Sequence, residues 1–307
     1  MKTQSIPFVP CVLAIVLLTS CGESDIQDIE RRELDAAQRA ADANVASQAN
    51  TPVAAAASGL AMEGLELVFS DEFNGNAINS DKWITALQWG ADLTINDELQ
   101  YYVDVQNMPN FGYNPFSFDG ESLIISAMPT PSELSAAANN LPYLSGVLSS
   151  AEKFDMTHGF IEARVDFPDG AGLWPAFWML GSEFVDLKPQ LFIAEGNGAK
   201  PESVFHNYNY HDVDGNLRSP GQWQVSQSDF ADGFHTVAVN WSPGELLFYI
   251  DGTPRYRIVG ENVSSQAMYM IVNLAVGGIW VGSPNAQTVF PAQYKIDYIR
   301  AYKHTGS

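Results

Sequence analysis

The residues of this chain best suited to chemistry lie in one short predicted strand, from Gln190 to Glu195. Carboxylates at both ends of such a strand could act together on a glycosidic bond, one as nucleophile and the other as general acid and base. Here only Glu195 is a carboxylate, because the amide Gln190 occupies the first position and Phe192 the third. A neutral amide oxygen is a poor nucleophile, so the strand carries half of a catalytic pair.

Tryptophans beside glycine or proline accompany this strand. Trp174 and Trp178 lie in the run Gly172–Leu180, and Trp89 and Trp280 lie in loop-like or strand-end contexts. Indole rings in such places can offer flat faces to the apolar faces of pyranoses. We therefore expect Trp174 and Trp280 to bind sugar and Trp178 to line the same binding cleft. For Trp89, sugar binding and core packing are both open. Core packing is expected for Phe69, Phe73, Trp83 and Trp241.

Other ionisable side chains near the strand have no spacing that aims them at the same sugar as Glu195. We expect four acids to be solvated loop residues: Glu183, Asp186, Asp212 and Asp214. We expect His206 and His211 to be surface or structural residues. No pair of side chains has metal-ligand spacing, so the sequence predicts no catalytic metal and no cofactor.

The first 21 residues have the features of a targeting signal. Lys2 provides a positive start, and the apolar run Val12–Leu18 is too short to span a bilayer. The sequence Leu18–Gly22 resembles a bacterial lipobox, in which the cysteine, here Cys21, is acylated and becomes the mature N-terminus. An ordinary cleaved signal peptide with an incidental cysteine is the alternative. Gly22, in place of Asp, favours an outer-membrane lipoprotein anchored in the cell envelope.

Residues 22–62 form a separate acidic and alanine-rich segment, which we expect to be a flexible tether. A partner-binding helix is the alternative for part of it. Residues 63–307 make up the predicted globular domain. Both cysteines of the chain, Cys11 and Cys21, lie in the leader, so this domain has no disulfide and depends on packing for its stability.

The net charge of −21 comes from 36 acidic and 15 basic residues. Such a surface repels phosphate backbones and anionic membranes, which argues against nucleic acid as a partner. It also disfavours strongly anionic polysaccharides as ligands. Membrane contact is expected only through the lipid anchor.

From Leu65 onward, short apolar alternations are separated by Gly, Pro, Asn and Asp. We expect strands over Leu65–Phe69, Ser122–Ala127, Phe160–Phe167, Thr236–Trp241, Leu246–Ile250, Met268–Leu274 and Lys295–Tyr302. Alternation of period two is clear where Ile161, Ala163 and Val165 interleave with polar residues. Many short strands without a long amphipathic helix predict an all-β fold, an antiparallel β-sandwich.

Seven landmarks occur together between Leu67 and Tyr302. They are Phe69–Gly75, Asn96–Tyr102, Ser145–Gly146, Gly159–Arg164, Gly172–Leu180, Asn273–Trp280 and Ile296–Arg300. In this order and spacing the chain resembles glycoside hydrolase family 16, the group of laminarinases, lichenases and agarases. The resemblance implies a concanavalin-like β-jelly-roll sandwich of two antiparallel sheets, whose concave sheet forms a cleft for β-linked polysaccharides.

The catalytic strand of that family has the pattern Glu-x-Asp-x-x-Glu, with a bulge that turns the last Glu into the cleft. The resemblance therefore implies that Gln190 replaces the nucleophile, that Phe192 replaces the Asp that tunes it, and that Glu195 is the acid/base. Hydrolysis with retention of the anomeric configuration needs the two outer carboxylates roughly 5 Å apart. Without neighbouring negative charges, Glu195 is expected to lose its proton more readily.

Two further positions follow from the resemblance. Asn209 stands in Tyr208-Asn209-Tyr210, where the family usually carries a cleft histidine, and is expected to contact the ligand. Some members hold a structural Ca²⁺ near the position of Asp297. This chain is accordingly a candidate for the same ion.

These observations support two main functions. The first is an envelope lipoprotein that recognises a β-glucan or galactan through this cleft, with hydrolysis impaired at Gln190. The alternative is an active endo-β-glycanase in which Glu195 is the acid/base and an unidentified group replaces the nucleophile. A structural lipoprotein with a vestigial cleft is the third reading, against which Trp174 and Trp280 argue.

Overall fold

In the computed structural model, residues 64–90, 94–183 and 187–305 are described. The predicted leader, its Cys21 and the tether lie outside these residues, as does Asp186. Across the described ranges the regular structure is β-strand, with one short 3₁₀ helix, η1, at Ser132–Leu134. No helix among these residues is long and apolar enough to cross a membrane.

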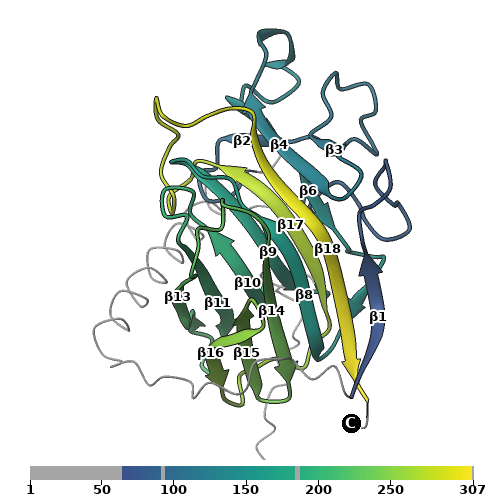
Figure 1. The fold of residues 1–307 in the computed structure, drawn as a ribbon, viewed down its shortest axis with the longest axis vertical. Helices are drawn as coiled ribbons and strands as arrows, with labels where there is room; N and C mark the ends of the chain where they lie inside the picture. The colour runs from purple at the N-terminus through teal and green to yellow at the C-terminus, as the bar shows by residue number, and fades with distance from the viewer. Residues whose placement is uncertain (1–63, 91–93, 184–186, 306–307) are drawn as a thin grey trace, which may run out of the picture.

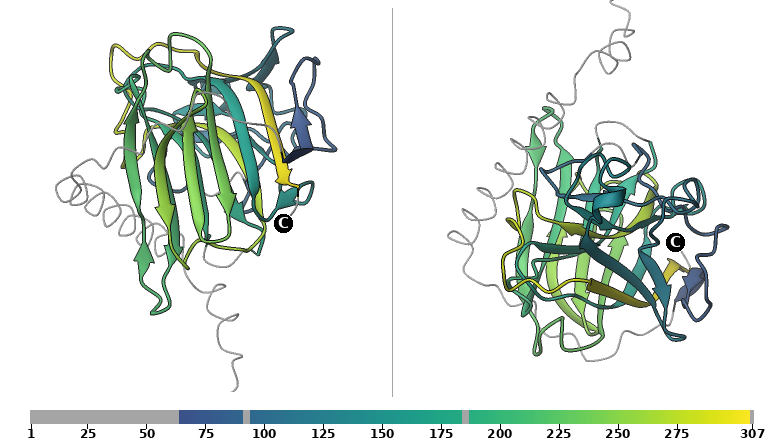
Figure 2. Two further views of the ribbon diagram at one scale, coloured as in Figure 1. Left: turned by 60° about the horizontal axis from the view of Figure 1, so that its bottom comes forward. Right: turned by 90° about the horizontal axis from the view of Figure 1, so that it is seen from above.

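The strands form two sheets that lie face to face (Figures 1 and 2). The larger sheet has the order β16 (Thr253–Val259), β15 (Glu245–Ile250), β14 (His235–Ser242), β8 (Gly159–Asp166), β18 (Ala292–His304), β4 (Leu123–Pro129), β5 (Tyr143–Ser145) and β2 (Gln100–Tyr102), with β1 (Leu65–Asp71) on β18 and β3 (Phe116–Phe118) on β4. All pairs are antiparallel except β2 with β5.

The smaller sheet carries the predicted catalytic strand at its centre. Its order is β12 (Leu217–Arg218), β11 (Ser203–His211), β10 (Gln190–Gly196), β9 (Leu173–Gly181), β17 (Met268–Val276) and β6 (Val147–Ser149), with β13 (Gly221–Val225) on β11 and β7 (Asp155–Met156) on β17. The predicted sandwich is thus confirmed. Each of the seven expected strands is present, with ends that differ by a few residues.

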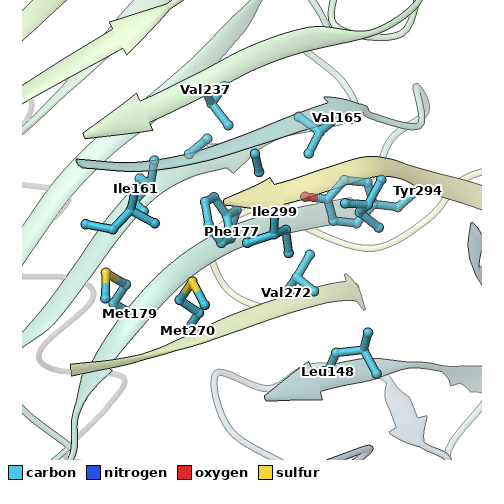
Figure 3. Packing of buried hydrophobic residues seen from close by; sticks show 14 of the residues in the cluster. Leu148, Ile161, Val165, Phe177, Met179, Val237, Met270, Val272, Tyr294 and Ile299 are labelled. Atoms are coloured by element: carbon cyan, nitrogen blue, oxygen red, sulfur yellow. The ribbon is translucent and has the colours of Figure 1, made fainter. Parts of the chain in front are cut away.

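The core lies between the sheets, as Figure 3 shows. Ile161, Ala163 and Val165 of β8 are fully buried, as their alternation predicts, and they face Phe177 of β9 and Val272 of β17. Trp83 and Trp241 are also fully buried, and Phe69 and Phe73 belong to the same core, as expected. Burial of this apolar surface is the main source of stability for a domain without a disulfide.

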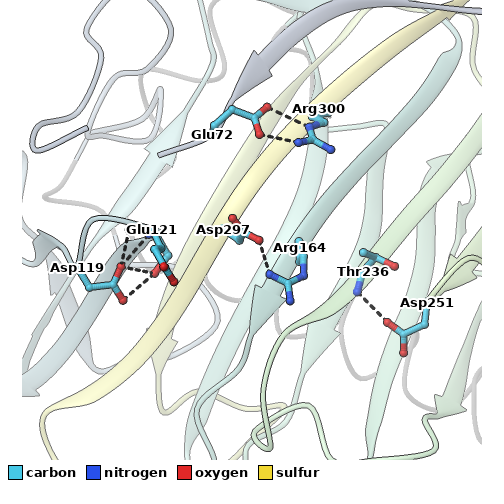
Figure 4. A network of polar contacts seen from close by, with 9 residues as sticks. Glu72, Asp119, Glu121, Arg164, Thr236, Asp251, Asp297 and Arg300 are labelled. Atoms are coloured by element: carbon cyan, nitrogen blue, oxygen red, sulfur yellow. Dashed lines mark hydrogen bonds and ion pairs between the residues drawn. The ribbon is translucent and has the colours of Figure 1, made fainter. Parts of the chain in front are cut away.

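The outer face of the larger sheet carries a set of polar contacts (Figure 4). Arg300 of β18 makes a bidentate pair with Glu72, at 3.0 and 2.6 Å. Asp297, the residue considered for calcium, is paired with Arg164 of β8. Among the described residues no group of three or more His, Cys, Asp or Glu side chains is placed to hold a metal. Calcium at Asp297 therefore receives no support.

Candidate functional site

Strand β10 places three predicted site residues on one face. Gln190, Phe192 and Glu195 line a common cleft, while Leu191 and Ile193 are fully buried in the core. Simple alternation would turn Glu195 to the core side, because it is an odd number of residues from Gln190. The register against β9 and against β11 shifts between Phe192 and Glu195. The predicted bulge is thereby confirmed, and it returns the Glu195 side chain to the cleft.

The cleft has a volume of about 870 Å³ including its open mouth. Strands β9, β10, β11 and β17 form its floor, and the segment before β2 closes one side. Its lining residues are Leu87, Ile95, Asn96, Glu98, Tyr102, Trp174, Ala176, Trp178, Lys188, Gln190, Phe192, Glu195, Asn207, Asn209, Leu217, Asn273 and Ala275.

Glu195 is a buried acid, with 5% of its surface exposed. Trp174 donates an indole N–H bond to Glu195 Oε1 at 3.2 Å. Burial raises the pKa of Glu195 to about 8, and the Trp174 bond offsets this only in part. Desolvation thus keeps the proton on this acid even without neighbouring negative charges. A protonated carboxyl at this position is suited to act as a general acid.

Gln190 is held in a line of uncharged groups. Its Oε1 accepts a hydrogen bond from Asn209 Nδ2 at 2.9 Å. Asn209 Oδ1 in turn accepts from Asn207 Nδ2 at 3.0 Å and from the Ser219 hydroxyl at 2.5 Å. The Gln190 oxygen, at the position where the resemblance predicts a nucleophile, is thus neutral and already accepts a hydrogen bond.

Phe192 places an aromatic ring in the cleft lining, at the position where the resemblance predicts an aspartate. Its ring stacks on Trp178 of β9, with centroids 5.2 Å apart and planes inclined by 14°. Trp178 is fixed in turn, because its indole N–H donates to Asn273 Oδ1 at 2.9 Å. The two rings form a joined apolar surface in the floor of the cleft.

The four predicted tryptophans separate into two groups. Trp174 and Trp178 line the cleft. Trp280 does not line it, but lies against Trp174 with ring centroids 5.0 Å apart, and stacks on Trp223 of β13 at 5.3 Å. Trp89 packs against the hydrophobic cluster that contains Trp178 and is also absent from the lining. Trp280 and Trp89 thus lie next to the lining without being part of it, a difference that neighbouring sequence does not reveal.

A second cleft carboxylate, Glu98, was not singled out by the sequence patterns. Asn96 Nδ2 donates to Glu98 Oε1 at 2.9 Å, and Gln100 Nε2 donates to Oε2 at 2.6 Å. Burial raises the pKa of Glu98 to about 7. Glu98 forms a β-bridge with Gly277, which follows β17. The position of Glu98 in the cleft therefore depends on contact between two landmarks, Asn96–Tyr102 and Asn273–Trp280. The only available signal was a glutamate flanked by amides within the landmark Asn96–Tyr102.

The other acids considered are not part of this lining. Asp212 accepts hydrogen bonds from Asn216 and Arg218 in the turn after β11, and Glu183 and Asp214 also lie outside the cleft. His211 is exposed, whereas His206 is fully buried. Of the two, only His206 is placed near the bulge of β10.

A serine, a histidine and an aspartate form a chain elsewhere, at the end of the larger sheet. The Ser228 hydroxyl lies 3.2 Å from His235 Nε2, and His235 Nδ1 lies 2.8 Å from Asp251 Oδ2. His235 Nε2 also faces the carbonyl oxygen of Asp229 at 3.2 Å, and Asp251 Oδ1 accepts from the Thr236 amide. Because a carbonyl oxygen can only accept, His235 Nε2 donates a hydrogen bond to Asp229. This bond connects the loop that contains Asp229 to β14.

Comparison with known proteins identifies the same scaffold. The family model of the glycosyl hydrolases of family 16 matches residues 97–300. The chain is 36% identical over 245 residues to endo-1,3-1,4-beta-glycanase ExsH of Rhizobium meliloti, covering 78% of this chain and 52% of that protein. It is 31% identical over 263 residues to a beta-glucanase of Rhodothermus marinus, covering 78% and 85%. The chain thus spans about half the length of the first of these relatives.

A solved structure agrees with the sequence relatives. The laminarinase catalytic domain of Thermotoga maritima superposes with a TM-score of 0.66 at 28% identity, over 78% of this chain and 98% of that domain.

Proposed function

Because the chain belongs to the glycosyl hydrolases of family 16, we propose that its cleft recognises a β-linked glucan and that hydrolysis in it is impaired. The observation that carries the proposal is the state of position 190, where a neutral amide is bound by Asn209 instead of a free carboxylate. Loss of a catalytic carboxylate commonly removes several orders of magnitude in rate. The remaining cleft keeps the features of a sugar site.

Those features are aromatic surface and neutral polar groups. The stacked rings of Trp178 and Phe192 offer an apolar face, and Asn207, Asn209 and Gln190 surround it with amides. Pyranose rings match such a surface, because their C–H faces are apolar and their hydroxyls need donors and acceptors. A β-linked glucan, the substrate class named for the relatives, fits this chemistry.

The proposal includes an envelope location. The lipobox-like Leu18–Gly22 would place a lipid on Cys21, and the segment 22–62 would tether the domain to the outer membrane. Labelling with a palmitate analogue, lost on Cys21→Ser, tests the anchor separately from the cleft.

Binding is tested by calorimetry with laminarin, mixed-linkage glucan and agar oligosaccharides. Binding to at least one of them is expected, and Phe192→Ala should weaken it because the aromatic floor loses one ring. Val259→Ala, on the exposed edge strand β16, is the matched control. No heat of binding with any of these glycans, for a folded protein, would refute the proposal.

Hydrolysis is the second candidate, and one observation favours it. Glu98 and Glu195 are both carboxylic acids that line the cleft in the described part of the chain. With Glu195 as the general acid, Glu98 would be the second carboxylate, either as base for a water molecule, which gives inversion at the anomeric carbon, or as nucleophile, which gives retention. Reducing-sugar release abolished by both Glu98→Gln and Glu195→Gln would favour this candidate over binding alone, and the anomer first formed, read by NMR, would tell base from nucleophile at Glu98.

A further inference from the structure

The bulge of β10 has a single residue opposite it, His206 of β11. Phe192 pairs with Asn207, and the next registered pair joins Glu195 to Phe205. Two residues of β10, Ile193 and Ala194, therefore face one residue of β11. Such a bulge disrupts the local ladder of backbone hydrogen bonds.

The side chain of His206 makes a hydrogen bond to this bulge. Its Nδ1 lies 2.5 Å from the carbonyl oxygen of Ile193, and both residues are fully buried. A carbonyl can only accept, so the proton is on Nδ1. A buried carbonyl needs such a donor, because desolvation without a hydrogen bond is costly.

The ring of His206 is itself held from the opposite sheet. It stacks on Phe248 of β15, with centroids 4.9 Å apart and planes inclined by 23°. Its Nε2 is buried without a hydrogen-bond partner, which suits an unprotonated nitrogen. Burial lowers the pKa of His206 to about 4, although the bond to Ile193 raises it in part, and so favours the neutral ring.

We propose that His206 is a positioning residue, which holds the bulge of β10 through Ile193 and thereby keeps the carboxyl group of Glu195 in the cleft beside Trp174. Without the bulge, period-two alternation would turn that side chain towards the core. The role concerns the placement of Glu195 and does not depend on which glycan the cleft takes, or on whether the glycan is cleaved.

Two substitutions separate the hydrogen bond from the packing. His206→Phe keeps a ring against Phe248 but removes the donor, whereas His206→Asn keeps a donor close to the position of Nδ1. Tyr208→Phe is the matched control, because Tyr208 is a buried residue of the same strand whose hydroxyl bonds to Asn262 and Ser264, away from the bulge.

The readout is NMR of the Trp174–Glu195 contact in the full chain. The indole N–H signal of Trp174 is assigned with Trp174→Phe, and the carboxyl titration of Glu195 with Glu195→Gln. We expect His206→Phe to shift the indole signal and to lower the Glu195 titration midpoint by about one pH unit as the acid becomes more solvated. His206→Asn should restore both signals, and Tyr208→Phe should leave both unchanged.

Unchanged signals in folded His206→Phe would overturn the proposal, as would equal shifts in Tyr208→Phe. If His206→Phe does not fold, the smaller His206→Leu is used, with the same shift expected. The unmodified protein offers an independent test, since ¹⁵N spectra of its histidine rings must show the proton of His206 on Nδ1. A proton on Nε2 would exclude the hydrogen bond to Ile193.

Discussion

The buried acid Glu195 should make the folded protein less stable as the pH rises. Its pKa is raised from 4.5 to about 8, chiefly by burial. Between these values the folded state retains a proton that the unfolded state has released, so the free energy of unfolding falls with increasing pH. The slope is about 1.4 kcal/mol per pH unit for one group, which gives about 5 kcal/mol over the window.

The substitution Glu195→Gln removes this titration and keeps an oxygen to accept the bond from Trp174. Urea unfolding of both proteins at pH 5, 7 and 9 measures the difference. Relative to the unmodified protein, Glu195→Gln should gain about 4 kcal/mol between pH 5 and pH 9, because about three pH units of the window lie in this range. Glu98→Gln should gain less, about 3 kcal/mol, since the pKa of Glu98 is raised only to about 7.

Glu133→Gln, on the short helix η1, is the control for removal of one acidic charge from an exposed position. Parallel stability curves for Glu195→Gln and the unmodified protein would mean that Glu195 is already ionised at neutral pH. In that case the argument from burial fails, and with it the assignment of Glu195 as a general acid.

Three further predictions follow from the same contacts. Gln190→Glu combined with Phe192→Asp should increase reducing-sugar release from laminarin above that of Gln190→Glu alone, because the single variant keeps the aromatic ring; no release by a folded double variant that binds laminarin would contradict this. His206→Asn should be less sensitive to acid than the unmodified protein in urea unfolding. The folded pKa of His206 lies near 4, so the unmodified protein loses about 3 kcal/mol as pH falls from 6.5 to 4; an equal loss in the variant would show that another group is responsible. Gly277→Ala should destabilise by about 2 kcal/mol or more, since its φ is +74° and a Cβ would lie 2.5 Å from Leu99 Cγ. Gly252→Ala, at φ +69° with no atom within 4 Å, is the control for backbone strain alone, and equal urea midpoints for the two variants would exclude the clash.

The strands could be predicted from the sequence because their signals are local, and the bulge because the strand resembles the catalytic strand of the family. Ile161, Ala163 and Val165 alternate with polar residues, and the spacing from Gln190 to Glu195 itself requires an inserted residue if both are to face one cleft. The elements of the site that depend on distant partners could not be predicted this way.

Glu98 is the clearest example of such a residue. Its place in the cleft depends on a bridge to Gly277, far along the chain. The roles of Trp89 and Trp280 likewise depend on which rings pack against them, and the proton of Glu195 depends on burial that only the folded sheet creates. Each of these properties depends on contacts between segments that are distant in the sequence, so no single segment predicts it.

The line of amides behind Gln190 has a direction, and that direction determines which atom meets the ligand. The hydroxyl of Ser219, in the turn between β12 and β13, donates to Asn209 and so turns the Nδ2 group of Asn209 towards Gln190. Gln190 must then point its carbonyl inward and present its two N–H bonds to the cleft. At the position where the resemblance predicts a carboxylate that offers electrons to a sugar carbon, this side chain would offer protons to a sugar oxygen, and Ser219, outside the cleft lining, fixes that orientation.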